Sequence, residues 1–211
     1  AKFFKDFTQV VEQAGNQLVA LNVYPQNIER LVYMAQALNR VGRTLVLEPN
    51  YYRLLRPYMA PEAALATINW DGDSKLPAQD ILTWDQVQAA PAQYAVQVDY
   101  EQHHDYIFSL SEGIYIHSNG VPLGAYDARY QPWLEGIVKA GWQFYHGHVS
   151  GHASTQDLCL VNYVVGAKLV VPWHSFKPER YAEALIDLGL TPWLPSLDTT
   201  YSADQIKSLA D

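Results

Sequence analysis

The sequence predicts an α/β fold, a mainly parallel sheet with helices on its faces. Short apolar runs of strand length alternate with amphipathic helical segments, and the connections between them are short. The 211 residues can bury a substantial core, and a composition of 49% hydrophobic and 17% charged residues is that of an ordinary globular protein. Parallel sheets bind ligands at the carboxyl ends of their strands, so residues that follow strands are the first site candidates.

The first part of the chain shows this alternation clearly. The expected elements are a helix over 3–14, a strand over 17–23, a helix over 28–38, a strand over 44–47 and a helix over 51–58. Asn27 precedes the helix over 28–38 and Asn50 the helix over 51–58, so both are expected N-caps. Strand, helix, strand and helix in this order indicate parallel strands joined by helical crossovers.

The rest of the chain is less regular before residue 113 and regular again after it. The expected elements are a short helix from Thr83 to Pro91, strands over 94–98, 107–110 and 113–118, a helix over 127–140, a strand over 142–145, a helix over 154–165, a strand over 168–172 and a helix over 178–188. His103, His104 and Asp105 are adjacent, so their side chains diverge and indicate a surface segment, not a metal site.

Composition limits the class of protein. The single cysteine, Cys159, excludes an internal disulfide framework and indicates a reducing, cytoplasmic environment. There is no apolar run of about 18 residues, so we expect no membrane span. The net charge of −8 disfavours non-specific coating of nucleic acid. Arginines nevertheless gather within 30–56, either as solvated helix ends or as a basic wall facing an anionic substrate.

The histidines are the main functional signal. His146, His148 and His152 follow the expected strand over 142–145, and His174 follows the expected strand over 168–172. Ser154 and Asp157 have the spacing of a capping box, so the residues before Ser154 lie at a helix N-terminus, which favours an anion. We therefore expect a site where two neighbouring strands each end in a histidine. His117 and Ser118, after the strand over 113–118, are further candidates.

These motifs resemble a known family. The stretch from His148 to Ser154, a helix, and then Val170-Val171-Pro172-Trp173-His174 are similar to the C-terminal motif pair of the β-CASP nucleases. These are enzymes of the metallo-β-lactamase fold, such as ribonuclease J. The segments Asn27–Arg30 and Ala37–Leu47, with a Gly-Arg pair before a strand, resemble the start of the β-CASP insert. Residues 116–124 resemble its late strand and loop. The likeness covers nearly the whole chain.

The resemblance implies a role for each matching residue. His152 would take part in proton transfer or phosphate contact beside the scissile bond, and His174 would bind one of two zinc ions. A substrate phosphate would be bound by residues around these motifs, namely Ser150, Gly151, His148 and Ser118. RNA would run along three arginines of the basic window, namely Arg30, Arg40 and Arg43. The implied activity is hydrolysis of RNA phosphodiester bonds.

The main zinc motif of the family, His-x-His-x-Asp-His, is absent from the chain. We therefore expect a fragment of a longer protein, with a β-CASP domain over 1–145 and a returning lactamase segment over 146–211. The fragment alone would be inactive and would expose an apolar surface, covered in the intact protein or by a homodimer partner. The alternatives are a hydrolase of a small ester or phosphodiester, a non-catalytic binding or scaffold relative, and a free-standing α/β binding domain.

Overall fold

The computed structural model describes residues 2–24, 26–68, 70, 75–147, 153–173 and 175–210. The chain forms two compact units, Ala1–Val149 (unit 1) and Ser150–Asp211 (unit 2), each described here by itself. The predicted division after residue 145 lies close to this boundary. That the units are a β-CASP domain and a lactamase segment stays a prediction.

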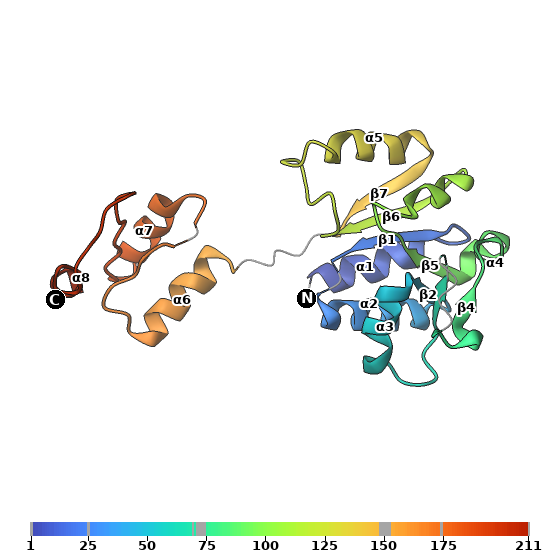
Figure 1. The fold of residues 1–211 in the computed structure, drawn as a ribbon, viewed down its shortest axis with the longest axis horizontal. Coiled ribbons are helices and arrows are strands. Elements are labelled where there is room, and N and C mark those ends of the chain that lie inside the picture. Colours follow the sequence, from blue (N-terminus) through green and yellow to red (C-terminus); the bar gives the residue numbers. More distant parts are fainter. Residues whose placement is uncertain are drawn as a thin grey trace. The chain divides into compact units, whose positions relative to one another are not determined.

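Unit 1 is built on a seven-stranded sheet in the order β4-β3-β2-β5-β1-β6-β7, and every pairing is parallel (Figure 1). The strands are β1 (Val19–Val23), β2 (Thr44–Leu47), β3 (Leu65–Ile68), β4 (Ile81–Leu82), β5 (Tyr94–Gln97), β6 (Gly113–Ser118) and β7 (Trp142–His146). The predicted α/β fold with a mainly parallel sheet is confirmed. β1 to β4 are buried or half-buried along their length, as expected for strands covered on both faces.

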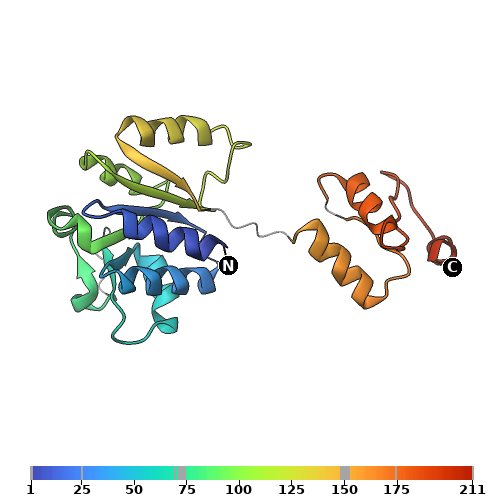
Figure 2. The same ribbon diagram turned by 180° about the vertical axis from the view of Figure 1, so that it is seen from behind.

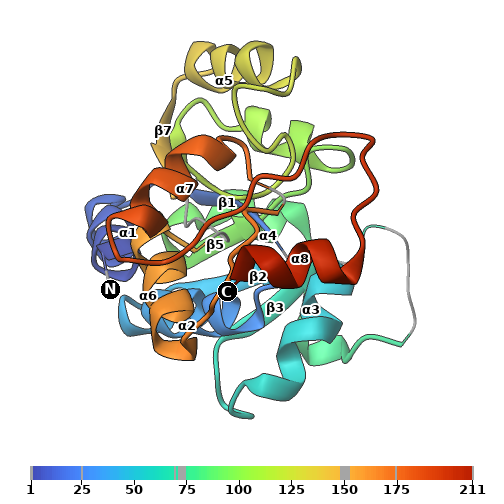
Figure 3. The same cartoon turned by 90° about the vertical axis from the view of Figure 1, so that its left-hand side faces the viewer.

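Helices cover both faces of the sheet. On one face lie α1 (Lys2–Gln13), α2 (Ile28–Arg40) and α3 (Pro49–Leu55), side by side in Figure 2. On the other lie α4 (Trp84–Ala89), α5 (Tyr130–Lys139) and the short helix η4 (His104–Ser109). Figure 3 shows α5 and α2 with the strands between them. Each face has its own apolar core, centred on Leu21 and Leu45 on the first and on Val46 and Tyr115 on the second.

The chain changes direction within the sheet, and this fixes where a ligand site is expected. The crossover after β1 runs through α2 on the first face, whereas those after β5 and β6 run through η4 and α5 on the second. β1 lies between β5 and β6, so loops leave neighbouring strands toward opposite faces at this point. Such a switch point opens a crevice at the carboxyl ends of the strands.

Most predicted elements of unit 1 are present, and the differences have local causes. Asn27 caps α2 as expected, accepting from the backbone N–H of Arg30 at 3.0 Å. Asn50 is not a cap, because Pro49 already occupies the first turn and Glu48 is the N-cap of α3. The segment 107–110 is not the expected strand but lies at the end of η4, with Ile107 buried. The sequence patterns do not predict β3 and β4.

Unit 2 is mainly helical in the residues described. It contains α6 (Thr155–Val165), α7 (Pro178–Ile186) and α8 (Ala203–Ala210) (Figure 1). The expected strand over 168–172 is reduced to a bridge, in which Val170 donates to Thr191 O at 2.9 Å and accepts from Trp193 N at 2.8 Å. A single bridge forms because only this short stretch has a neighbouring backbone to pair with among the described residues.

Helix α6 is apolar but largely exposed. Cys159 is its only fully buried residue among those described. Side chains around the rest of the helix are 59–74% exposed, namely Leu160, Val161, Tyr163, Val164 and Val165. A helix that is hydrophobic on several faces is normally buried, so unit 2 as it stands leaves this helix without cover.

Among the residues described, no helix is both long enough and apolar enough to cross a membrane.

Candidate functional site

The residues that carry the strongest functional prediction lie outside the part of the chain that the structure describes. These are His148, Ser150, Gly151, His152 and His174. Their predicted roles therefore stay predictions, and the structure describes only some of their neighbours in the sequence.

The neighbours of His152 and His174 line one groove in unit 2. Ala153 follows His152 in the sequence, and Trp173 and Ser175 flank His174; all three line a groove of about 900 Å³. Its walls come from the start of α6, the segment 170–177 and the first turns of α7. Segments well separated in the sequence thus meet at one opening. The expected pair of neighbouring strands that each end in a histidine is not present in the described part of the chain, because β7 belongs to unit 1 and residues 168–172 form only a bridge.

The groove is positively charged. Lys177 and Arg180 line it, and no aspartate or glutamate does among the residues described. This contrasts with the unit as a whole, since residues 150–211 contain seven Asp and Glu but four Lys and Arg. Half of the cations of an acidic unit therefore lie at one groove, where they favour an anionic ligand.

The start of α6 beside the groove is fixed by the predicted capping box. Ser154 Oγ accepts from the backbone N–H of Asp157 at 3.1 Å, and Asp157 Oδ2 accepts from Ser154 N at 3.3 Å and from Ser154 Oγ at 2.7 Å. The cap holds Ala153 and Thr155 in position at the groove wall. It also places a carboxylate at the helix N-terminus, which offsets the attraction of the helix dipole for an anion.

Ser118 and His117 lie inside unit 1, not at a surface. Both are 0% exposed at the end of β6. The hydroxyl of Ser118 lies 3.4 Å from Arg30 Nη1, from which it accepts a hydrogen bond. A substrate phosphate cannot reach Ser118 in this position, which corrects its predicted role in phosphate binding.

Two of the three arginines predicted to lie along a nucleic-acid path are buried. Arg43 is 3% exposed, and its guanidinium donates to the carbonyl oxygens of Gly15, Gln17, Pro91 and Tyr94 at 2.7–3.3 Å. Arg30 is 7% exposed and donates to Asn119 Oδ1 at 3.0 Å. Burial lowers the pKa of both guanidinium groups. These side chains hold loops together and do not form a wall.

The third arginine, Arg40, lies at the amino ends of the strands, whereas Arg30 lies at their carboxyl ends. Arg40 is exposed at the end of α2, near the start of β2, where Arg43 also lies. Arg30 is in the first turn of the same helix, beside the residue that follows β6. Of the three predicted arginines, Arg40 alone is exposed to solvent and could contact a nucleic acid in this structure. The predicted roles of Arg30 and Arg43 are therefore wrong, and that of Arg40 stays a prediction.

The carboxyl ends of the unit 1 strands carry a polar cluster that the sequence patterns do not predict. Glu48, directly after β2, is 7% exposed. Its Oε1 accepts from the backbone N–H of Asp99 at 3.0 Å and lies 3.5 Å from His103 Nδ1. Burial raises the pKa of this carboxyl, and the charge of Asp99 adds to the increase, while the Asp99 N–H and His103 oppose it. His103 stacks on Trp70 with ring centroids 4.5 Å apart.

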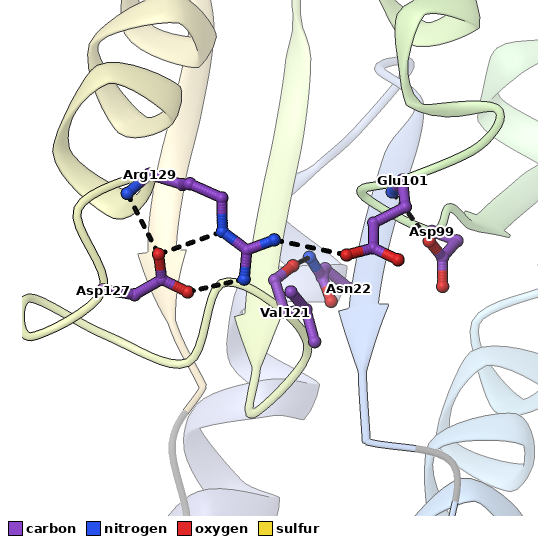
Figure 4. A network of polar contacts seen from close by, with 6 residues as sticks. All are labelled: Asn22, Asp99, Glu101, Val121, Asp127 and Arg129. Atoms are coloured by element: carbon purple, nitrogen blue, oxygen red, sulfur yellow. Dashed lines mark hydrogen bonds and ion pairs between the residues drawn. The ribbon is translucent and has the colours of Figure 1, made fainter.

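A second polar cluster at the carboxyl ends of the strands connects the loops after β5 and β6. Figure 4 shows the Arg129 guanidinium between Asp127 and Glu101, with donor–acceptor distances of 2.7–3.2 Å. Asp99 accepts from the backbone N–H of Glu101 at 2.7 Å. The hydrogen bonds from Arg129 lower the pKa of Asp127 to about 2. Because two carboxylates surround one guanidinium, this rim is acidic overall and does not favour an anion.

His104 is a core residue, so the expectation of a surface triplet over 103–105 is wrong. It is 7% exposed, and Trp133 Nε1 donates to His104 Nε2 at 2.9 Å. An indole N–H can only donate, so this imidazole nitrogen carries no proton. Burial lowers the pKa of His104, in agreement with a neutral ring. The signal available in the sequence is the aromatic content nearby, which predicts a packed cluster, not solvent.

Among the described residues, no group of three or more His, Cys, Asp or Glu side chains is arranged to hold a metal ion. The residues that the structure describes therefore do not by themselves provide a zinc site.

Comparison with known proteins gives a fold but no function. No family model and no curated protein matches the chain. A solved structure of a protein of unknown function from Enterococcus faecalis V583 is 26% identical, with a TM-score of 0.75 over 92% of this chain and 43% of that one. A lysine decarboxylase from Selenomonas ruminantium is 11% identical over 99% of this chain and 54% of that one, and its TM-score of 0.27 is too low to indicate a shared fold.

The first of these similarities bears on length. The chain spans less than half of the Enterococcus faecalis protein, whose fold it shares.

Proposed function

We propose that this chain is part of a metallo-β-lactamase-fold, zinc-dependent hydrolase that cleaves phosphodiester bonds of RNA. Unit 1 would be its β-CASP domain and unit 2 the returning segment of its catalytic domain. The observation that carries the proposal is the groove in unit 2, whose lining includes the neighbours of both His152 and His174 and is cationic. A groove of this kind suits a phosphodiester, because its cations favour an anion. By the resemblance, the imidazoles of His152 and His174 would act on that anion.

Two further observations support a longer protein. Helix α6 exposes apolar side chains that an isolated domain would bury, among them Val164 at 74% and Val165 at 73%. The chain also matches only 43% of a solved protein with which it shares a TM-score of 0.75. Both fit a unit 2 that packs against a part of the catalytic domain supplied from elsewhere in a longer chain, or by a second copy in a homodimer.

The roles assigned to this chain follow from the resemblance and the groove. His152 would transfer a proton to or from the reacting phosphodiester or contact its phosphate. His174 would be one zinc ligand. Because the described residues contain no other group of metal ligands, the remaining ligands would come from a longer chain. The groove itself would orient the phosphate beside the two histidines.

The test is hydrolysis of a fluorescently labelled RNA by the full-length protein, with and without a chelator. His152→Ala should lower kcat by about 100-fold or more while leaving bound zinc unchanged, since a general acid or base contributes this much. His174→Ala should lower both activity and bound zinc. His146→Gln is the matched control, because His146 contacts Tyr130 at 3.1 Å and has no assigned role. RNA hydrolysis that survives His152→Ala and His174→Ala at full rate would refute the assignment.

A second candidate is a hydrolase of small phosphodiesters. It is favoured by the net charge of −8 and by the acidic rim of Glu101, Asp127 and Asp99 in unit 1, which would repel a long polyanion. Hydrolysis of bis(p-nitrophenyl) phosphate without hydrolysis of RNA oligonucleotides would favour this candidate over the ribonuclease.

A further inference from the structure

We propose that the groove in unit 2 is a binding site for single-stranded nucleic acid, with Lys177 and Arg180 contacting phosphates and Trp173 and Phe176 stacking on bases. The inference rests on the proposed function for the place of this groove beside the reacting phosphate. It adds the residues that would bind the strand, in place of the arginines of unit 1 that are buried.

The two cations are free to bind a ligand. Both are exposed, and neither forms an ion pair with a carboxylate among the residues described. This differs from Arg129 in unit 1, which is held between Asp127 and Glu101. A cation that forms no ion pair attracts phosphate more strongly than one already neutralised. Glu179 lies between the two cations in the sequence but does not line the groove. Lys177 is the N-cap of α7 and Arg180 lies in its first turn, and both line the same groove.

Two aromatic side chains at the same groove are almost fully exposed. Trp173 is 82% exposed and Phe176 is 95% exposed, and both line the groove with the cations. Two exposed aromatic rings at one groove form an apolar patch of the kind that marks a binding site. Cations that follow a phosphate backbone, together with aromatic rings on which bases stack, are the combination by which proteins bind single strands without reading a sequence.

A second groove of unit 2 shows that this combination is not general to the surface. It has a volume of about 530 Å³ and is lined mainly by apolar residues of α6 and α7, such as Leu160, Tyr163 and Leu188. Its charged residue is Asp187, and it has no cation among the residues described. That groove suits a protein segment, whereas the groove with Lys177 and Arg180 suits an anionic strand carrying aromatic bases.

The test is binding of a fluorescein-labelled single-stranded RNA oligonucleotide to the chain, followed by anisotropy in EDTA, so that no metal and no hydrolysis takes part. Lys177→Gln with Arg180→Gln should weaken binding roughly tenfold or more at 100 mM salt. It should also reduce the slope of log K against log salt by about 0.7 for each phosphate that the protein no longer neutralises. Lys168→Gln with Lys207→Gln is the matched control, because it removes the same charge from unit 2 outside the groove and should change binding less than twofold.

The aromatic residues are tested in the same assay. Trp173→Ala and Phe176→Ala should each weaken binding by roughly fivefold without changing the salt slope, since stacking releases no counterions. Equal effects of the groove and control pairs, or no effect of either aromatic change, would overturn the proposal. This test is independent of catalysis. RNA binding through the groove by a protein that never hydrolyses RNA would refute the proposed function alone. RNA hydrolysis together with unchanged RNA binding in the groove variants would refute the groove as the binding site alone.

Discussion

Arg43 gives the sharpest test of how unit 1 is held together. Its guanidinium donates to four carbonyl oxygens from three separate segments, namely Gly15 and Gln17 before β1, Pro91 after α4, and Tyr94 at the start of β5. The side chain is 3% exposed. We expect Arg43→Met to destabilise unit 1, because it keeps the apolar stem but removes four buried hydrogen bonds to carbonyl oxygens.

The magnitude follows from the contacts. Removing one partner of a buried, charge-assisted network costs about 3–5 kcal/mol, because the groups left behind are not solvated. For a protein of this size about 4 kcal/mol corresponds to a decrease in Tm of roughly 8–16 °C. Arg43→Lys should lose about half as much, since the ammonium keeps the charge but cannot reach all four acceptors at once.

The assay is urea unfolding followed by far-UV circular dichroism, with Arg40→Gln as the control. Arg40 is exposed at the end of α2, so its replacement should change the free energy of unfolding by less than about 0.5 kcal/mol. Equal free energies of unfolding for the Arg43→Met and Arg40→Gln proteins would refute the structural role of Arg43. Arg43 would then again be a candidate for contact with a ligand.

Two further predictions concern the protonation of His104 and the helix cap at Ser154. Burial lowers the pKa of His104 below its ordinary 6.5, so the unfolded chain binds the proton more readily than the folded one. The free energy of unfolding should therefore fall by up to about 1.4 kcal/mol per pH unit as the pH drops from about 6.5 toward the folded pKa. His104→Gln should lack this loss when urea midpoints at about pH 7.5 and 5.5 are compared. Ser154→Ala should lower the stability of unit 2 by about 1 kcal/mol in thermal unfolding, because α6 loses its cap, whereas Ser208→Ala in α8 should change it by less than about 0.5 kcal/mol; equal effects would contradict the capping assignment.

The parts of the fold that the sequence predicts correctly are those in which local and long-range signals agree. The helix capped by Asn27 and the strand over 44–47 have both a periodic apolar pattern and a recognisable boundary. β3 is not predicted because Leu65–Ile68 follows a region of loops, so no helix marks where the strand begins. The expected strand over 107–110 fails because Ile107 is buried by tertiary packing against the second core, which a short helical turn satisfies equally well.

The site is predicted less well than the fold, for an electrostatic reason. A cluster of arginines in the sequence does not reveal whether each guanidinium faces solvent or polar groups of the protein interior. The guanidinium groups of Arg30 and Arg43 bind polar groups of the protein interior, because they lie at the carboxyl and amino ends of the strands, where loops meet. Lys177 and Arg180 give no signal in the sequence, because two cations in an acidic segment are ordinary until the fold places them at one groove.

The central claim is that His174, a zinc ligand, and His152, a catalytic residue, belong to one half of an active site whose other half lies outside this chain. Zinc binding measured by titration and by elemental analysis tests it directly, on this chain and on the full-length protein side by side. We predict about two tightly bound zinc ions per full-length protein, weak binding to this chain alone, and loss of zinc on His174→Ala in the full-length protein. Tight, stoichiometric zinc binding by this chain alone, abolished by His152→Ala or His174→Ala, would contradict it.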